Sequence, residues 1–401
     1  MIDRGLINGY IKRIEAELLN NILPFWINNT VDKENGGFYG EVSNHLVVNT
    51  GATKGSLLNS RILWTFSAAY RRYKNQACLD MAQYAYHALI ELFWDDTYDG
   101  LYWEISSDGK PLKTRKQIYG QAFGIYALAE YYAATGDRQA LEKAIAIFDA
   151  IEAHSFDPPH GGYLEACSRT WQPIDDVRLS PQDMNEQKSQ NTHLHILEAY
   201  TNLLRVWDNT HLLQQQTTLI QVMLNQITDP KTHHLILFLD TDWQPQSDLI
   251  SYGHDIEASW LLYEAAEIVG DPQLVEEVRP RVLRIAQAVY DQGLDIDGGL
   301  FYESSPSGDV NKRKSWWPQV EAAVGFLNAY QLSGQPHFLT AALKSWDFIE
   351  ENFVDHQYGG WFRYANHDAP EYLNEPKVSF WKCPYHNSRA CMELTSRLGN
   401  L

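Results

Sequence analysis

The sequence predicts an all-α fold, an (α/α)6 barrel of twelve helices with short β-hairpins at one rim, formed by a single domain over residues 1–401. Three observations support this prediction. A glycine–aromatic segment returns at a nearly constant period, the apolar residues between its copies have helical spacing, and short glycine turns join successive helices.

The repeated segment first appears as "NGGFYGE" at residues 35–41 and returns as "DGLYWEIS", "HGGYLEA", "DGGLFYES" and "YGGWFRYA". The glycines that precede the aromatic residues are Gly37, Gly100, Gly162, Gly299 and Gly360. The gaps between them are 63, 62, 137 and 61 residues, so one gap is close to twice the others. We therefore expect a sixth, divergent copy near His233, and a fixed period of this kind indicates a repeat architecture.

Most intervals between copies hold two stretches with helical apolar spacing, and the long interval holds four. The twelve expected helices are 6–25, 56–73, 77–94, 117–134, 139–154, 184–207, 211–227, 255–269, 272–292, 317–332, 337–353 and 384–398. Short turns such as "TGD" at Thr135 and "VGD" at Val269 join antiparallel neighbours. Alternating short and hairpin-bearing connections close naturally into a barrel with six inner and six outer helices.

The helix that follows each hairpin is expected on the inside, because it is rich in Ala, Leu, Tyr and Trp on several faces. All six inner helices then begin at the same end of the barrel, and the hairpins form that rim, with glycine supplying the turns and the aromatic residues the floor. The alternative is an open α-solenoid built from the same helix pairs.

Composition and charge narrow the classes of partner. The chain has 401 residues, 44% of them hydrophobic, and a formal net charge of −19, so no nucleic acid partner is expected and a neutral or cationic ligand is easier to accept. No stretch resembles a signal peptide or a membrane span, so no membrane partner is expected. The four cysteines lie far apart without a C-x-x-C pattern. We expect a reduced, cytoplasmic protein.

Unusual polar and aromatic residues should gather where the inner helices begin. The residues at these positions are Arg61; Tyr119; Asp183, Asn191, His193, His195 and Glu198; His254, Asp255 and Glu257; Trp316, Trp317 and Glu321; and Trp381, Tyr385 and His386. Helical spacing then selects among them. Asn191, His195 and Glu198 share one face, whereas His193 points elsewhere, toward the barrel wall. His195, His254 and His386 thus converge on one lumen, accompanied by Arg61.

Three chemistries fit three histidines. A tri-histidine zinc site is one, although no two of them lie at i,i+4 on one helix and no H-E-x-x-H is present. Glycoside cleavage needs two carboxylates, for which Glu257 with Asp183 or Glu321 could serve. Proton transfer at carbon suits histidine, whose ordinary pKa is about 6.5. Two histidines on opposite faces of a planar enediolate could take one proton and return another, which is epimerisation, with Arg61 stabilising the oxyanion.

Each of these residues also has a purely structural interpretation. The histidines could be hydrogen-bonded core residues, and Arg61 could be a buried ion-pair partner of Glu257 or Asp183. The tryptophans Trp316, Trp317 and Trp381 could be plain core, although aromatic platforms are also how proteins stack on sugar rings.

One segment on each inner helix resembles a signature segment of the cellobiose 2-epimerases, within the N-acylglucosamine 2-epimerase superfamily. The six segments are "KGSLLNSRILWTFSAAYR", "QIYGQAF", "NTHLHILEAYTNL", "SYGHDIEASWLL", "WWPQVEA" and "WKCPYHNSRA". The resemblance runs in order from about Gly36 to Cys391. It implies an (α/α)6 barrel that inverts C2 of the reducing-end sugar of β-1,4-linked disaccharides such as cellobiose and lactose, with no metal and no cofactor.

The resemblance also implies a role for each matching residue. His386 resembles the base that takes the C2 proton of the glucose-type epimer, and His254 the partner that returns a proton on the other face. The other implied residues are His195 for ring opening and enediolate support, Arg61 at the substrate oxygens, Tyr119, Asp183, Asn191 and Glu257 in the surrounding polar shell, Trp317 under the reducing-end ring, and Trp381 against the second sugar.

Several functions therefore stay open. The leading expectation is a metal-independent 2-epimerase acting on a small-molecule sugar, most simply a β-1,4-disaccharide. A mannose/glucose 2-epimerase or a mannose isomerase would act on free monosaccharides through the same enediolate. An (α/α)6 glycoside hydrolase would release free glucose, and a non-catalytic sugar-binding protein would exchange no hydrogen.

Overall fold

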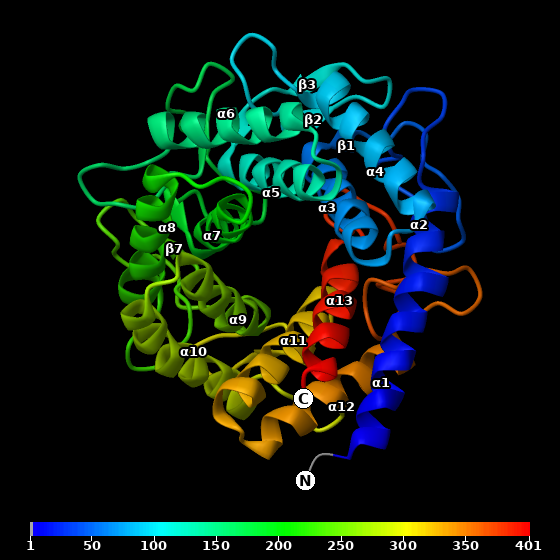
Figure 1. Ribbon diagram of the computed structural model, residues 1–401, viewed down its shortest axis with the longest axis vertical. Coiled ribbons are helices and arrows are strands. Elements are labelled where there is room, and N and C mark those ends of the chain that lie inside the picture. The colour runs from blue at the N-terminus through cyan, green and yellow to red at the C-terminus, as the bar shows by residue number, and fades with distance from the viewer. Residues whose placement is uncertain (1–2) are drawn as a thin grey trace.

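Six inner helices surround the barrel axis and a second ring of helices surrounds them in the computed structural model, which describes residues 3–401 (Figure 1). The inner helices are α3 (Ser56–Tyr73), α5 (Ile118–Thr135), α7 (Gln190–Leu204), α9 (Tyr252–Val269), α11 (Trp316–Ser333) and α13 (Tyr385–Gly399). Three of the outer helices are α6 (Arg138–His154), α10 (Pro272–Gln292) and α12 (Pro336–Asn352).

The other three outer helices each contain a π-helical turn. The first runs as α1 (Arg4–Glu17), η1 (Leu18–Ile22) and α2 (Leu23–Asn29); α4 (Gln76–Ala88) continues into η2 (Leu89–Phe93), and α8 (Thr210–Val222) into η3 (Met223–Ile227). Counted as continuous units, residues 3–401 contain twelve helices, as the repeat predicts.

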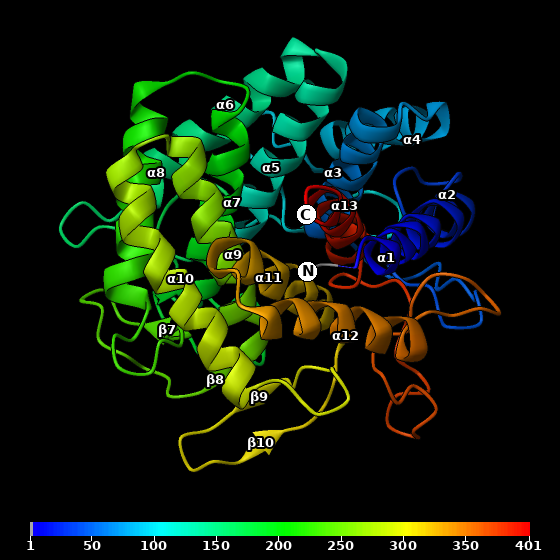
Figure 2. The same cartoon turned by 60° about the horizontal axis from the view of Figure 1, so that its bottom comes forward.

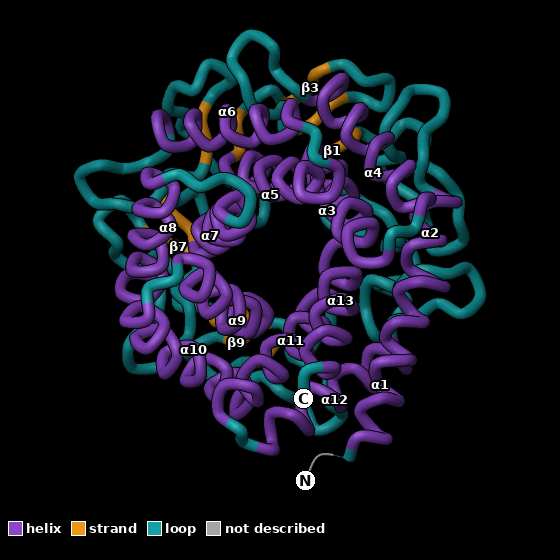
Figure 3. Tube along the Cα trace, viewed as in Figure 1, coloured by secondary structure: helices purple, strands orange, loops and turns teal. Residues whose placement is uncertain are grey.

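The ring of inner helices is closed. Each inner helix packs against the next one in sequence, and α13 returns to pack against both α3 and α1 (Figure 3). Residues 56–69 of α3 are all buried, because the helix is covered by its neighbours on every side. The (α/α)6 barrel is therefore confirmed, and the open solenoid is wrong.

The two ends of the barrel differ. At one end, short turns join each inner helix to the following outer helix, and α5, α9 and α11 end at Gly136, Gly270 and Gly334, whose φ angles are 78°, 78° and 69°. Glycine adopts this left-handed conformation without steric cost, which is why it ends these helices. The opposite end carries the hairpins and strands, as Figure 2 shows for β8, β9 and β10.

The strands tie neighbouring repeats together at this end. They are β1 (Lys54–Gly55), β2 (Glu104–Ile105), β3 (Pro111–Lys113), β4 (Lys116–Gln117), β5 (Ala166–Cys167), β6 (Lys188–Ser189), β7 (Phe238–Leu239), β8 (Ile250–Ser251), β9 (Glu303–Ser304) and β10 (Val310–Asn311). They form the antiparallel sheets β1-β2-β3, β4-β5, β6-β7 and β10-β9-β8. The strands that lead into α3, α5, α7 and α9 each pair with a strand of the following repeat, and Ser315, just before α11, bridges to Tyr364, so these inner helices begin at this rim.

The divergent sixth copy lies where the spacing predicts it. Thr228 and Leu235 form a bridge that matches the bridge between Val31 and Phe38 in the first copy. His233, with a φ of 64°, occupies the position that a glycine holds in other copies. The prediction of a copy near His233 is therefore confirmed.

A buried lysine pins most hairpins to the start of the next inner helix. Lys54 Nζ lies 2.7 Å from Asp32 Oδ2 and donates to the carbonyl of Gly36 at 2.6 Å. Lys116–Asp95 (3.1 Å) and Lys188–Asp157 (2.8 Å) are equivalent pairs with a buried lysine, and Lys314–Asp295 (2.6 Å) is an equivalent pair that is partly exposed. Lys377 forms a further buried pair with Asp355 and donates to the carbonyl of Gly359. Because a buried ammonium needs an acidic or carbonyl partner, each pair fixes the hairpin in one position relative to the helix.

One predicted helix begins in the wrong place. The sequence predicts a helix over 184–207, but α7 begins at Gln190 and ends at Leu204. Lys188 and Ser189 form strand β6 instead, and the Ser189 hydroxyl accepts from the Thr192 amide at 3.1 Å, which caps the helix. Asp183 therefore lies in the loop before β6.

Among the helices of residues 3–401, none has the length and apolar character needed to cross a bilayer.

Replacing Lys54 with methionine should lower the free energy of unfolding by about 3–5 kcal/mol, because Asp32 would be left buried without its cation. Chemical denaturation followed by circular dichroism measures this. The matched control is Lys110→Met, since Lys110 forms an exposed pair with Asp108 and its loss should change stability little. A Lys54→Met variant as stable as the control would contradict the proposed pinning role.

Candidate active site

A cavity of about 890 Å³ opens at the end where the inner helices begin. All ten residues singled out from the sequence line it: Arg61, Tyr119, Asp183, Asn191, His195, His254, Glu257, Trp317, Trp381 and His386. The repeat explains how they come together. Tyr119, Asn191, Trp317 and His386 are each the second residue of an inner helix. A second layer lies one turn deeper and includes Arg61, His195 and Glu257, each the sixth residue of its helix.

His386 is held by a carboxylate. Its Nδ1 lies 2.7 Å from Glu321 Oε1, on the neighbouring helix α11. A carboxylate that also receives hydrogen bonds from Trp260 and Arg389 acts as an acceptor, so Nδ1 carries the hydrogen and Nε2 is the free base. Burial lowers the pKa of the His386 imidazole well below its ordinary value, and the cations Arg61 and Arg389 act in the same direction.

His254 has a different partner. Its Nδ1 lies 2.8 Å from the hydroxyl of Ser251, which can donate or accept. Burial, together with the nearby His195, lowers the pKa of His254 to about 3. No carboxylate of residues 3–401 contacts its ring, so this histidine can change its protonation state without breaking an ion pair.

One indole connects the two rings. The ring centroid of Trp317 lies 4.7 Å from that of His254 and 5.7 Å from that of His386. The two imidazoles, from α9 and α13, therefore pack against the same side chain and line the same cavity.

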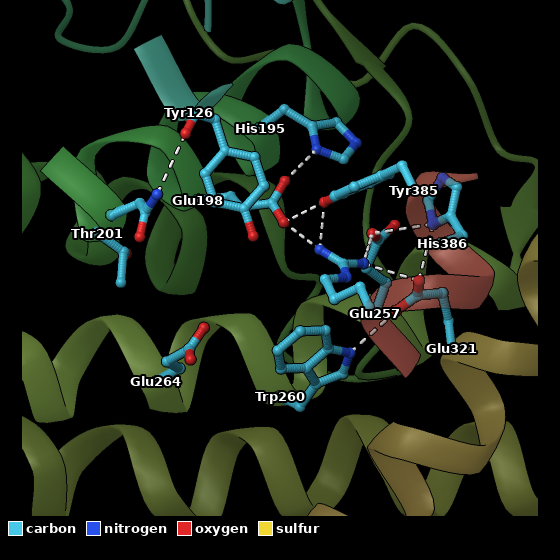
Figure 4. Close-up of polar contacts among 12 residues, drawn as sticks. Tyr126, His195, Glu198, Thr201, Glu257, Trp260, Glu264, Glu321, Tyr385 and His386 are labelled. Atoms are coloured by element: carbon cyan, nitrogen blue, oxygen red, sulfur yellow. Dashed lines mark hydrogen bonds and ion pairs between the residues drawn. The ribbon is translucent and has the colours of Figure 1, made fainter. Parts of the chain in front are cut away.

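His195 lies deeper, beside Tyr119. Its Nδ1 is 2.9 Å from Glu198 Oε2 (Figure 4). Its ring packs edge-on against Tyr119 at 4.9 Å between centroids. Burial alone would raise the pKa of Glu198, but Arg389 and the hydrogen bond from His195 lower it to about 2. Glu198 is therefore a carboxylate. Burial lowers the pKa of His195, although Glu198 opposes that shift.

Arg61 is buried and points a guanidinium into the cavity. It donates to the Tyr119 hydroxyl at 2.6 Å, to the carbonyl of Trp381 at 3.4 Å, and stacks over Phe123 at 4.2 Å. It forms an ion pair with neither Glu257 nor Asp183, so that structural alternative is wrong. Its charge has no carboxylate partner among the described residues and is available to a ligand oxygen.

The remaining predicted residues lie around these groups. Asp183 accepts from the Ser180 amide at 2.8 Å in the loop before β6. Asn191 lines the cavity, and its buried Oδ1 has no hydrogen-bond partner in the part of the chain that the structure describes. His193 bonds instead to the main chain of Tyr163 and Ser189, so it faces the wall as expected.

The tri-histidine zinc site and one of the two carboxylate pairs considered for glycoside cleavage, Glu257 with Glu321, lose their geometry. Within residues 3–401 the only group of three candidate metal-binding side chains is Glu257, Glu321 and His386, so the three histidines do not form a ligand set. Glu257 Oε1 and Glu321 Oε1 both accept from Nη2 of Arg389 at 2.7 Å, so the guanidinium already serves as their cation. A carboxylate pair bound to one nitrogen leaves no room between its members for a glycosidic bond.

Burial raises the pKa of both glutamates, and that of Glu257 rises further. The reason is that Glu321 accepts from His386, Trp260 and Arg389, whereas Glu257 accepts from Arg389 alone and its Oε2 has no partner. Glu257 is thus the carboxyl of the pair that more readily holds a proton.

Five contacting residues are absent from the ten predicted ones; Glu198, Glu321 and Tyr385 are among the unusual residues at the helix starts, whereas Ser251 and Arg389 are not. Ser251 precedes His254 by three residues, and Arg389 follows His386 by three. Tyr385 donates to Glu198 and contacts Arg389. The i,i+3 spacing was visible in the sequence, but only contacts between helices show that these side chains support the histidines.

Residues 37–390 match the profile of the family described as N-acylglucosamine 2-epimerase (GlcNAc 2-epimerase). The cellobiose 2-epimerase of Bacteroides fragilis is 45% identical to the chain over 384 residues, covering 96% of this chain and 98% of that protein. The cellobiose 2-epimerase of Ruminococcus albus is 39% identical, with 96% and 98% covered. The solved structure of the cellobiose 2-epimerase from Bacillus thermoamylovorans has a TM-score of 0.91 at 39% identity, covering 97% of this chain and 100% of that chain.

Proposed function

The chain belongs to the N-acylglucosamine 2-epimerase family and is a sugar 2-epimerase, and we propose that it inverts C2 of the reducing-end sugar of a β-1,4-linked disaccharide such as cellobiose. The single observation that supports this best is the arrangement of His254 and His386. They come from different helices, line one cavity and pack against the same indole, that of Trp317.

In the proposed reaction His386 accepts the C2 hydrogen as a proton at Nε2. The electron pair of the broken C–H bond enters a cis-enediolate, whose negative charge opposes the lowering of the His254 pKa by burial; His254 takes up a proton from water and delivers it to the opposite face of C2. His386 then returns its proton to water, and the reverse reaction uses the two histidines in the opposite order. Glu321 supports the first step because it keeps the hydrogen of His386 on Nδ1.

The enediolate carries negative charge on the sugar oxygens, and Arg61 is placed to stabilise it. The guanidinium has no carboxylate partner among the described residues, it is held by Tyr119, and burial strengthens its interaction with an anion. His195 supports ring opening in this proposal, and Tyr119, Asn191, Asp183 and Glu257 bind the hydroxyl groups.

The cavity supports a disaccharide as the substrate. Its volume of about 890 Å³ lies near the upper end of the range, roughly 300–1,000 Å³, that small-molecule sites occupy. Trp317 lies beside the histidines and would stack on the reducing-end ring, while Trp381, whose carbonyl accepts from Arg61 and whose ring centroid lies 6.2 Å from that of Tyr119, would stack on the second sugar. The relatives named cellobiose 2-epimerase favour the same substrate class.

The proposed function is tested by incubating the protein with cellobiose, lactose or mannose in deuterated water with EDTA and following C2 by NMR. Conversion of cellobiose to its mannose-ended epimer, with deuterium entering C2, is the expected result. Conversion of mannose alone would indicate a monosaccharide epimerase, and a ketose product a mannose isomerase. Release of glucose from cellobiose would indicate a hydrolase.

Replacing either His254 or His386 with alanine should lower kcat by about 10²–10⁴-fold, the usual contribution of a positioned acid–base group. Circular dichroism should show an intact fold, because Arg389 still pairs with Glu321 when His386 is removed, and the Nδ1 partner of His254 is an uncharged hydroxyl. The control is His87→Ala on the exposed face of α4, which should leave kcat unchanged. A loss below tenfold in either site variant would contradict the assignment.

The pH profile of kcat/KM should have its acid limb below about pH 6.5, the ordinary histidine value. His386 acts as a base only when neutral, and burial lowers its pKa, so the neutral form persists to lower pH than that of an exposed histidine. Activity should therefore be lost only as the pH falls through this lowered value. An acid limb centred at pH 6.5 or above would contradict a buried base.

A further inference from the structure

Arg389 lies at the centre of the buried charges behind the site. It is on α13, one turn after His386, and is 3% exposed. Its Nη2 donates to Glu257 Oε1 and Glu321 Oε1, both at 2.7 Å, while Nη1 contacts Glu198 and the Tyr385 hydroxyl. Three carboxylates from α7, α9 and α11 thus share one guanidinium (Figure 4).

Two of these carboxylates hold histidines. Glu198 accepts from His195 at 2.9 Å, and Glu321 accepts from His386 at 2.7 Å. Without Arg389, three buried carboxyl groups would face one another with no cation, so they would take up protons or move apart. A protonated carboxyl can donate to Nδ1 instead of accepting from it, and the hydrogen of the imidazole would then move to Nε2.

We propose that Arg389 is a positioning residue that keeps the Nε2 atoms of His195 and His386 free to act as bases. It does so indirectly, by keeping Glu198 and Glu321 ionised and in place. The proposal rests on the proposed function, since it takes these histidines to be the groups that act on the sugar. His254 is independent of this network, because its Nδ1 partner is the Ser251 hydroxyl.

The far end of the barrel gives separate access to this guanidinium. A second cavity of about 300 Å³ is lined by Arg389 and Glu198, together with Tyr126, Trp260 and other residues from the middle and later turns of the inner helices. Arg389 Cζ lies 4.7 Å from the Trp260 ring centroid, so a planar cation at this place stacks on an indole. Neither Arg389 nor Glu198 lines the sugar cavity, so they separate the two openings.

The test compares Arg389→Lys and Arg389→Ala with the matched control Arg397→Lys. Arg397 lies two turns further along α13 and 5.8 Å from the same indole, but it pairs with Glu393 and contacts no carboxylate that holds a histidine. We expect the Arg389 variants to lose at least tenfold in kcat, with KM changed by less than about threefold, because the lost interaction acts on the reacting state. The control should keep both constants.

If Arg389 had a purely structural role, adding a cation to the variant that lacks it would not restore activity. In Arg389→Ala we expect methylguanidinium, entering from the far end, to raise kcat at least tenfold, and to have no effect on His386→Ala. No rescue in a folded Arg389→Ala protein would overturn the proposal, as would an Arg389→Lys variant with unchanged kcat.

Nitrogen NMR of protein labelled at histidine reports which ring nitrogen carries the hydrogen. This measurement needs no substrate and does not depend on how much of a variant folds. In the unsubstituted protein the rings of His195 and His386 should carry hydrogen on Nδ1. In Arg389→Lys these two signals should change while that of His254 does not. Hydrogen on Nε2 of either ring in the unsubstituted protein would overturn the proposal. If His386→Ala keeps its activity while these NMR changes occur, the proposed function fails and the positioning effect stands.

Discussion

A buried charge needs a partner, and in this barrel the partner comes from another helix or from the hairpin beside it. Lys54 meets Asp32 across a hairpin, Glu321 on α11 meets His386 on α13, and Arg61 on α3 meets Tyr119 on α5. Because an unpaired charge in a dry interior is costly, each of these contacts fixes the relative position of two elements. The same constraint that closes the ring therefore also aligns the side chains of the site.

The site is formed by residues at equivalent positions of successive repeats. Four inner helices place their second residue on the cavity wall, and these residues are an amide, an indole, an imidazole and a phenol. The repeated framework supplies the geometry, and divergence among the copies supplies the chemistry. His254 departs from this rule by one position, since it is the third residue of α9, and it also differs from the other two histidines in having a hydroxyl rather than a carboxylate partner.

The barrel could be predicted because single residues mark the repeat period: a glycine precedes each aromatic segment, and a divergent copy lies at His233. The cavity-lining residues could be predicted because a helix that follows a hairpin exposes its first two turns to the lumen. The helix after Asp183 was predicted to begin at residue 184 instead of Gln190, because the sequence does not reveal that Lys188 and Ser189 pair with a distant strand. Arg389 was missed because its importance arises from Glu198, Glu257 and Glu321, three residues that only the closed fold brings together.

The central claim is that two different histidines act on the two faces of one carbon, and the fate of the C2 hydrogen tests it most directly. Cellobiose carrying deuterium at C2 would be incubated in ordinary water, and the epimer and the remaining cellobiose would be separated at low conversion. If His386 removes the deuterium from C2 and His254 delivers a proton to the other face, the first-formed epimer should contain ordinary hydrogen at C2. The recovered cellobiose should keep its deuterium. An epimer that retains the original deuterium would show that a single group carries the hydrogen from one face to the other, and would contradict the account.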